Sequence, residues 1–180
     1  MHRNQSNNRG FSLIELMVTL AIAAVLIGVA LPSFKDIMAN SQMAATNNAL
    51  VYSVQMARST SMERLTPAGV CVTSDPAADN AVCDAGASYS DGWIVYADDN
   101  GNGVRDADED ILDRSDVPGP ACTFTPSASF EDQIYFNDSG NSINVAGVPM
   151  SGTIGVDYSG GIQVRLITVS ANGRVSTETP

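Results

Sequence analysis

The feature that most constrains this chain is an apolar run close to its N-terminus. Among the 21 residues from Phe11 to Leu31, only Ser12, Glu15 and Thr19 are polar. A hydrocarbon layer about 30 Å thick is crossed by roughly 20 apolar residues in a helix, so this run has the length and composition of a transmembrane segment. We therefore expect a membrane helix at residues 11–31, followed by a second region built from the rest of the chain.

The charges before the run predict its orientation. Residues 1–10 contain Arg3 and Arg9 and no acidic residue. Positive residues favour the cytoplasmic side of a membrane helix, which places the N-terminus in the cytoplasm and the chain after Pro32 on the far side. The sequence thus predicts a single-pass membrane protein whose C-terminal domain lies on the side opposite the cytoplasm.

Three interpretations of the run agree with its composition. A cleaved secretory signal peptide needs a small-residue site of the A-x-A type, and no clear one follows the run. Glu15 also weighs against a signal peptide, because a carboxylate near the bilayer centre costs roughly 2–3 kcal/mol of insertion free energy. The other two interpretations are an uncleaved anchor and an assembly segment processed at a specific motif.

The residues at the start of the run favour a processed segment. Residues 10–16, Gly-Phe-Ser-Leu-Ile-Glu-Leu, resemble the processing site of type IV pilins and of the pseudopilins of type II secretion. The resemblance implies that a prepilin peptidase cuts between Gly10 and Phe11, removing the leader peptide 1–10, and that Phe11 is then N-methylated. It also implies that Glu15 pairs with the N-terminal amine of a neighbouring subunit during assembly, which would give the carboxylate a partner in the membrane.

A second helical pattern continues the first. Gly28 and Pro32 should weaken and bend the helix, because glycine has a low helix propensity and proline removes a backbone hydrogen bond. Beyond them, apolar and small residues recur at helical spacing in two adjacent stripes. The stripes are Leu50, Val54, Ala57 and Ser61, and Ala45, Ala49, Tyr52 and Met56. We predict one bent helix from about residue 11 to about residue 64, whose amphipathic continuation, residues 32–66, carries a sheet.

From residue 67 onward the chain contains short runs of β-branched and aromatic residues separated by turn residues. The predicted strands are 70–73, 93–97, 111–114, 134–137, 143–145, 153–158, 162–170 and 174–176, and residues 158–162 predict a tight hairpin. The connections are too short for crossover helices, so the sheet should be antiparallel. The sequence therefore predicts an α+β chain in which residues 67–180 form a periplasmic antiparallel β domain.

Short sequence motifs within this β region resemble one branch of that family more specifically. Gly-Trp-Ile-Val-Tyr at 92–96, the acidic loop after it and Asn-Gly-Arg-Val at 172–175 are similar to the H-type minor pseudopilins of type II secretion and the FimT-like minor pilins of type IV pili. Residues 119–129 match no part of that pattern. The resemblance implies a pilin-like fold, and other pilins or pseudopilins as partners through the N-terminal helix. It also implies a disulfide between Cys71 and Cys83, with Cys122 either a buried thiol or an alternative partner in the bridge.

The acidic loop has a chemistry of its own. Asp98, Asn100, Asn102, Asp106 and Glu109 match D-x-[DN]-x-[DN]-G-x5-E, the calcium-loop pattern in which oxygens at alternating positions converge on one cation. Strands rather than helices are predicted on both sides, however. A hairpin built from the Asn-Gly pairs at 100–101 and 102–103 is therefore the alternative, and Ca²⁺ is the one cofactor considered.

Composition excludes several classes of function. The only histidine, His2, lies in the leader, so the processed chain has no Ser-His or Cys-His catalytic pair and no His-containing zinc site. Loss of the two leader arginines lowers the net charge from −11 to −13, and strong acidity repels nucleic-acid phosphates. We find no catalytic constellation and predict a protein that is not an enzyme.

These observations predict a FimT-like minor pilin that takes part in assembly, initiation or tip formation of a type IV pilus. The alternatives are an H-type minor pseudopilin of type II secretion and a DNA-binding minor pilin for natural transformation. In the DNA-binding pilins the resemblance implies a C-terminal Gly-Arg-x-Arg, but Ser176 replaces its second arginine here. Arg165 and Arg174 alone would neutralise few phosphates, so DNA binding at Arg174 is disfavoured.

Overall fold

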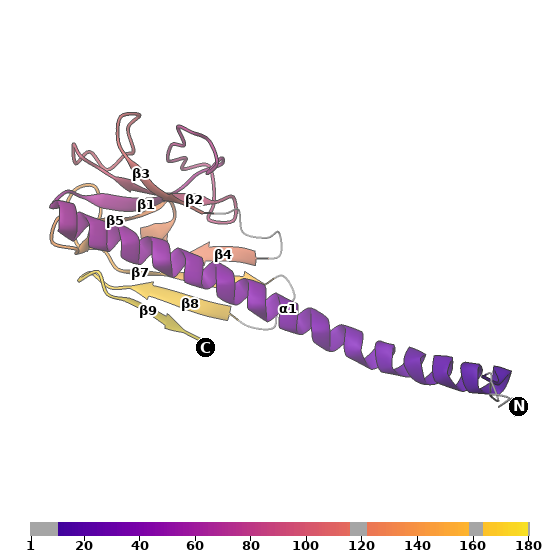
Figure 1. Ribbon diagram of the computed structural model, residues 1–180. Helices are drawn as coiled ribbons and strands as arrows, with labels where there is room; N and C mark the ends of the chain where they lie inside the picture. The colour runs from indigo at the N-terminus through magenta and orange to yellow at the C-terminus, as the bar shows by residue number, and fades with distance from the viewer. Residues whose placement is uncertain (1–10, 116–121, 159–163, 180) are drawn as a thin grey trace, which may run out of the picture. The chain divides into compact units, whose positions relative to one another are not determined.

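The computed structural model describes residues 11–115, 122–158 and 164–179, except for the side chains of residues 29–36 and 39. The chain divides into two compact units, Met1–Met38 and Ala39–Pro180, which are described separately. One helix, α1 (Leu13–Arg64), contributes residues to both units and is continuous in its secondary structure through Gly28 and Pro32 (Figure 1). The bend expected at these two residues stays a prediction.

The described part of the first unit is helical from Leu13 onward, and α1 begins with a capped turn. The backbone N–H of Glu15 donates a hydrogen bond of 3.3 Å to the hydroxyl oxygen of Ser12, the residue before the helix. A serine at this place satisfies one of the unpaired donors at a helix start. The carboxylate of Glu15 lies in the first turn, where a negative charge interacts favourably with the helix dipole.

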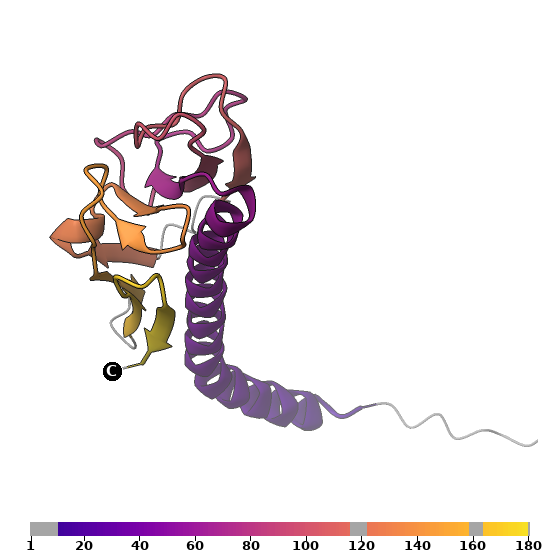
Figure 2. The same cartoon turned by 90° about the vertical axis from the view of Figure 1, so that its left-hand side faces the viewer.

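The strands of the second unit form two antiparallel sheets, which Figure 2 shows beside the second-unit part of α1. The five-stranded sheet has the order β3-β2-β1-β5-β6 and the four-stranded sheet the order β4-β7-β8-β9. The strands are β1 (Ala68–Val72), β2 (Trp93–Ala97), β3 (Ile111–Arg114), β4 (Cys122–Pro126), β5 (Gln133–Phe136), β6 (Ser142–Ile143), β7 (Gly152–Tyr158), β8 (Val164–Val169) and β9 (Val175–Glu178). A 3-10 helix, η1 (Ala128–Phe130), lies between β4 and β5 in the chain. The predicted α+β class and the antiparallel pairing are confirmed.

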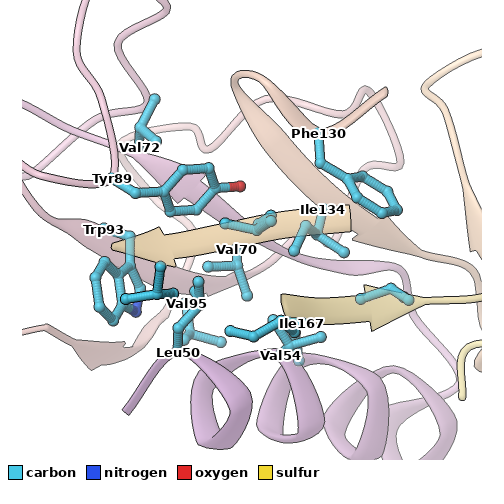
Figure 3. Close-up of a cluster of buried hydrophobic side chains, with 14 of the residues drawn as sticks. Leu50, Val54, Val70, Val72, Tyr89, Trp93, Val95, Phe130, Ile134 and Ile167 are labelled. Atoms are coloured by element: carbon cyan, nitrogen blue, oxygen red, sulfur yellow. The ribbon is translucent and has the colours of Figure 1, made fainter. Parts of the chain in front are cut away.

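The second-unit part of α1 and both sheets share one hydrophobic core (Figure 3). Leu50, Val54 and Ala57, from the first predicted stripe, are fully buried in it. They share this cluster with apolar side chains of both sheets, including Val70, Val95, Ile134, Ile154 and Ile167. Full burial of one such aliphatic side chain stabilises the fold by about 1.5–3 kcal/mol, so this stripe anchors α1 on the sheets.

Of the second predicted stripe, only Met56 packs against this core. Ala45, Ala49 and Tyr52 are exposed, and Met56 is only half-buried. Only one face of α1 contacts the sheets, so residues about a quarter-turn away from that face remain at the surface.

Trp93 joins three elements at one end of the core. Its indole N–H donates a hydrogen bond of 2.9 Å to the hydroxyl oxygen of Ser53 on α1. Its ring lies edge-on to that of Phe124 in β4, with the ring centroids 5.9 Å apart. The tryptophan of β2 thus connects the five-stranded sheet to the helix and to the four-stranded sheet.

Most predicted strands occur within one or two residues of their expected bounds. β4 is the exception, because it falls in residues 119–129, for which no strand was expected. The predicted hairpin at 158–162 lies mostly outside the described residues, although β7 and β8 on either side of it pair antiparallel.

Candidate functional site

Residues 11–28 of the first unit present an apolar surface with a single charged residue. All described side chains from Phe11 to Gly28 are exposed, and Phe11 itself is 81 % exposed. Glu15 is the only ionisable side chain among residues 11–28. Exposed apolar surfaces of this extent are typical of sites that contact other proteins or lipid. This surface is the first candidate functional site.

No helix in the described part of the chain combines the length and the apolar character needed to cross a membrane. The transmembrane segment predicted for residues 11–31 is not identified in the structure and stays a proposal.

The second candidate site, the acidic loop between β2 and β3, is organised around the buried carboxylate of Asp98. One carboxylate oxygen accepts hydrogen bonds from the backbone N–H groups of Gly101 (2.7 Å) and Asn102 (3.1 Å), and the other accepts one from Gly103 (2.6 Å). The hydroxyl of Tyr135 donates to that second oxygen as well. Burial, reinforced by this hydrogen bond, raises the pKa of Tyr135 well above its ordinary value, so the phenol keeps the proton that it donates.

Glu109 closes the same loop from its other end. Its carboxylate accepts hydrogen bonds from the backbone N–H groups of Asp99 at 2.9 Å and Asp106 at 2.8 Å, and Glu109 is only 5 % exposed. The amide nitrogens of Asn100 and Asn102 each lie 2.7 Å from one carboxylate oxygen of Asp106. Each acidic oxygen named here therefore has a partner within the loop.

The predicted calcium ligands make hydrogen bonds within the loop, and calcium binding there stays a prediction. Asp98 and Glu109 direct their carboxylates to backbone N–H groups rather than to a shared position with Asp106. Within the described residues, no group of three or more acidic, cysteine or histidine side chains is placed to hold a metal ion. β2 and β3 pair antiparallel across this loop, and Gly101 and Gly103 have the positive φ that glycine adopts readily in tight turns.

Two arginines that the sequence analysis did not predict as site residues bind the loop between β1 and β2, residues 73–92, which contains Cys83 of the disulfide. The guanidinium of Arg105, only 6 % exposed, donates to the side-chain oxygen of Asn80 at 2.6 Å and to the backbone oxygen of Glu109 at 2.9 Å. Arg114 donates to the backbone oxygens of Pro76 at 2.8 Å and Asp79 at 3.0 Å. Both arginines bind neutral carbonyl or amide oxygens, so charge complementarity in the sequence could not have revealed them.

The disulfide implied by the family resemblance, Cys71–Cys83, is present. Cys71 lies in β1 and Cys83 in the loop after it, 12 residues along the chain. Cys122 is a buried free thiol whose sulfur lies 3.7 Å from the hydroxyl oxygen of Thr46 on α1. Of the two states left open for Cys122, the structure contains the buried thiol.

Removing the disulfide should measurably destabilise the second unit. The double variant Cys71→Ala, Cys83→Ala is expected to lose about 3 kcal/mol of unfolding free energy, because the bridge restricts the unfolded chain across this short loop. Urea unfolding followed by circular dichroism would measure the loss. A reducing agent should destabilise the parent protein equally and leave the double variant unchanged. A double variant as stable as the parent would contradict the prediction.

Arg174, the candidate DNA-binding residue, lies in the turn between β8 and β9. The preceding Gly173 has a φ of +75°, and the turn packs against Arg58 of α1, whose guanidinium donates to the backbone oxygen of Asn172 at 3.1 Å. Arg165 lies in β8 and is half-buried. The lining of the groove beside Arg174 contains Arg58 but not Arg165, so the two arginines of the DNA hypothesis do not form one patch there.

Residues 46–173 of this chain match the family model described as type II transport protein GspH. Residues 5–31 match the prokaryotic N-terminal methylation motif. The first match covers most of the second unit, including α1 from Thr46 and the acidic loop. The second match covers the predicted cleavage site and the apolar run.

Similar proteins come from pilus systems. Fimbrial protein EcpB of Eikenella corrodens is 36 % identical over 74 residues, 41 % of this chain and 43 % of that protein. Fimbrial protein EcpC of the same organism is 48 % identical over 40 residues, 22 % of this chain and 26 % of that protein, so the chain matches less than half the length of either relative.

The type IV minor pilin FimU of Pseudomonas aeruginosa aligns with a TM-score of 0.52 at 16 % identity, covering 81 % of this chain and 95 % of that chain. This likeness shows a shared fold. Together with the family match over 46–173 and the methylation motif before it, it leads to one conclusion. The chain belongs to the GspH family of type IV pilin-like proteins.

Proposed function

We propose that this protein is a FimT-like minor pilin, held in the inner membrane by residues 11–31 with its second unit in the periplasm. Its role is structural rather than enzymatic, in assembly, initiation or tip formation of a type IV pilus. The observation that carries the proposal is the exposed apolar surface of residues 11–28, which coincides with the methylation motif at 5–31. Other pilins would cover this surface in a fibre.

The proposed assembly step uses the ends created by processing. Cleavage between Gly10 and Phe11 would leave a new amine at Phe11, four residues before Glu15. In a water-poor bundle of helices, an unpaired carboxylate is costly, and a neighbouring subunit's amine would offset that cost. Apolar packing supplies the adhesion between helices, and this ion pair would fix their register.

The description of the matching family supports a second candidate, a minor pseudopilin of the type II secretion machine. The two candidates differ in where the protein accumulates and what its loss affects. Deletion of the gene should reduce surface pili if the first candidate is right, and export of folded proteins across the outer membrane if the second is. The FimU likeness establishes the fold and does not separate the two.

Intact mass spectrometry tests the processing step shared by both candidates. In cells with the prepilin peptidase, we expect a chain that starts at Phe11 and carries one added methyl group. Gly10→Val should retain residues 1–10, because the peptidase of this family cuts after the glycine. Gly28→Ala is the matched control, since a side chain there meets no atom within 4 Å. Normal processing of Gly10→Val, or a parent chain that is never cut, would refute the proposal.

A further inference from the structure

A groove on the second unit contains two cations and no acid. It has a volume of about 250 Å³ and lies between α1 and the start of β9. Its lining consists of Gln55, Arg58, Ser59, Met62, Arg174 and Val175. In a chain with a net charge of −11, a concave site lined only by positive and neutral residues differs in charge from the protein as a whole. We refer to it as the Arg58–Arg174 groove.

Neither cation is neutralised within the described residues. Arg58 is half-buried and donates to two uncharged acceptors, the backbone oxygens of Gly140 at 3.0 Å and Asn172 at 3.1 Å. Arg174 is exposed, and its guanidinium has no hydrogen-bond or ion-pair partner in the described part of the chain. By contrast, Arg64 near the same end of α1 pairs with Asp110 at 3.0 Å. The groove therefore keeps an unbalanced positive charge.

Two glycine turns hold the groove in shape. Gly140 and Gly173 have φ angles of +73° and +75°. A β-carbon on Gly173 would lie 2.0 Å from the backbone oxygen of Gly140 and 2.6 Å from the Nε of Arg58. The two turns thus pack directly on one another and on the guanidinium. Arg58 is fixed before any partner arrives, which reduces the entropy lost on binding.

We propose that the Arg58–Arg174 groove binds a carboxylate side chain of a partner polypeptide, and this proposal rests on the assembly role, which supplies such neighbours. Guanidinium groups form paired hydrogen bonds with carboxylates, and Met62 and Val175 offer apolar surface to the stem of an aspartate or glutamate. The volume lies below the 300–1,000 Å³ typical of small-molecule sites, which suits one side chain. Two cations in an acidic protein would hold a nucleic-acid backbone poorly.

A peptide titration tests the groove directly. The probe is a peptide with blocked ends, Asp-Ala-Asp-Glu-Asp, which copies residues 106–110, the most acidic stretch of this chain. It is added at low salt to the full chain in neutral detergent, labelled with ¹⁵N-arginine. We expect saturable shifts of the Nε–Hε signals of Arg58 and Arg174. Arg174→Gln should weaken binding at least fivefold. Arg64→Gln, which changes the net charge equally outside the groove, should change it less than twofold.

The proposal would be overturned if the acidic peptide caused no saturable shift of the arginine signals, or if the uncharged peptide Asn-Ala-Asn-Gln-Asn caused equal shifts. It would also be overturned if Arg174→Gln and Arg64→Gln weakened peptide binding equally, or if a thymidine pentanucleotide bound more tightly than the acidic peptide. The assembly role is judged separately, by recovery of the processed chain in sheared fibres. If the parent chain enters fibres but does not bind the peptide, only the proposed binding at the groove is refuted. If the chain binds the peptide but never enters fibres, only the assembly role is refuted.

Discussion

Asp98→Asn is expected to lower the unfolding free energy by about 3 kcal/mol, because it changes an acceptor of several hydrogen bonds into a mixed donor and acceptor. In the structure, three backbone N–H groups and the hydroxyl of Tyr135 all donate to this one carboxylate, which is fully buried. An amide has only one oxygen. Its NH₂ group would face backbone donors on one side, and at least one buried N–H would lose its partner.

Urea unfolding of the full chain would measure this loss, with Asp108→Asn as the matched control. Asp108 lies in the same loop, is exposed and makes no hydrogen bond with its side chain in the described residues, so its replacement should cost less than about 0.5 kcal/mol. Tyr135→Phe removes one donor and should cost about 1–2 kcal/mol. A loss below about 1 kcal/mol for Asp98→Asn would show that the loop does not depend on this carboxylate.

The same loop shows what a sequence pattern can and cannot determine. The spacing of Asp98, Asn100, Asn102 and Glu109 indicated an oxygen-rich loop, and the two Asn-Gly pairs indicated tight turns within it. The pattern could not reveal that Tyr135, 37 residues away, donates to Asp98 and that backbone N–H groups occupy the carboxylates. Whether acidic oxygens face a cation or the backbone depends on such distant contacts.

The fold was more predictable, because its main signals are local. The period of 3.6 residues identified Leu50, Val54 and Ala57 as the buried face of α1. Alternation and turn residues located most strands. β4 has a usable signal, since its threonines point outward and its final proline is tolerated on an edge strand. The division into two sheets could not be predicted, because it depends on which strands pair across long separations.

The arginines also make contacts that could not be predicted, because their partners lie far away in the sequence. Arg58 contacts Gly140, 82 positions away, and Arg105 contacts Ala81, 24 positions away, in both cases through neutral backbone oxygens. No charge pattern predicts such pairs. The Arg58–Arg174 groove could therefore not be predicted from the sequence, although Arg174 itself was considered as a DNA-binding residue. Only the packing of the 137–141 and 170–174 turns on α1 brings the two guanidinium groups to one groove.

Glu15→Gln is expected to leave the chain processed and membrane-bound but to reduce its amount in sheared fibres at least tenfold. The amide keeps the size of the side chain and removes the charge that would attract a neighbour's Phe11 amine. Two opposite charges 4 Å apart interact by about 4 kcal/mol at an effective dielectric constant of 20, and about 1.4 kcal/mol already changes an equilibrium tenfold. Losing the pair is therefore sufficient to reduce incorporation of the subunit by at least tenfold.

The matched control is Glu63→Gln, which makes the same chemical change at an exposed glutamate of α1 in the second unit. The fibre content of each variant would be compared by quantitative mass spectrometry, with the membrane fraction measured in parallel. Equal losses for both variants would mean that net charge, rather than a specific pair, controls incorporation. Normal incorporation of Glu15→Gln would show that apolar packing alone sets the register of the helices. The carboxylate at the start of α1 would then contribute only its interaction with the helix dipole.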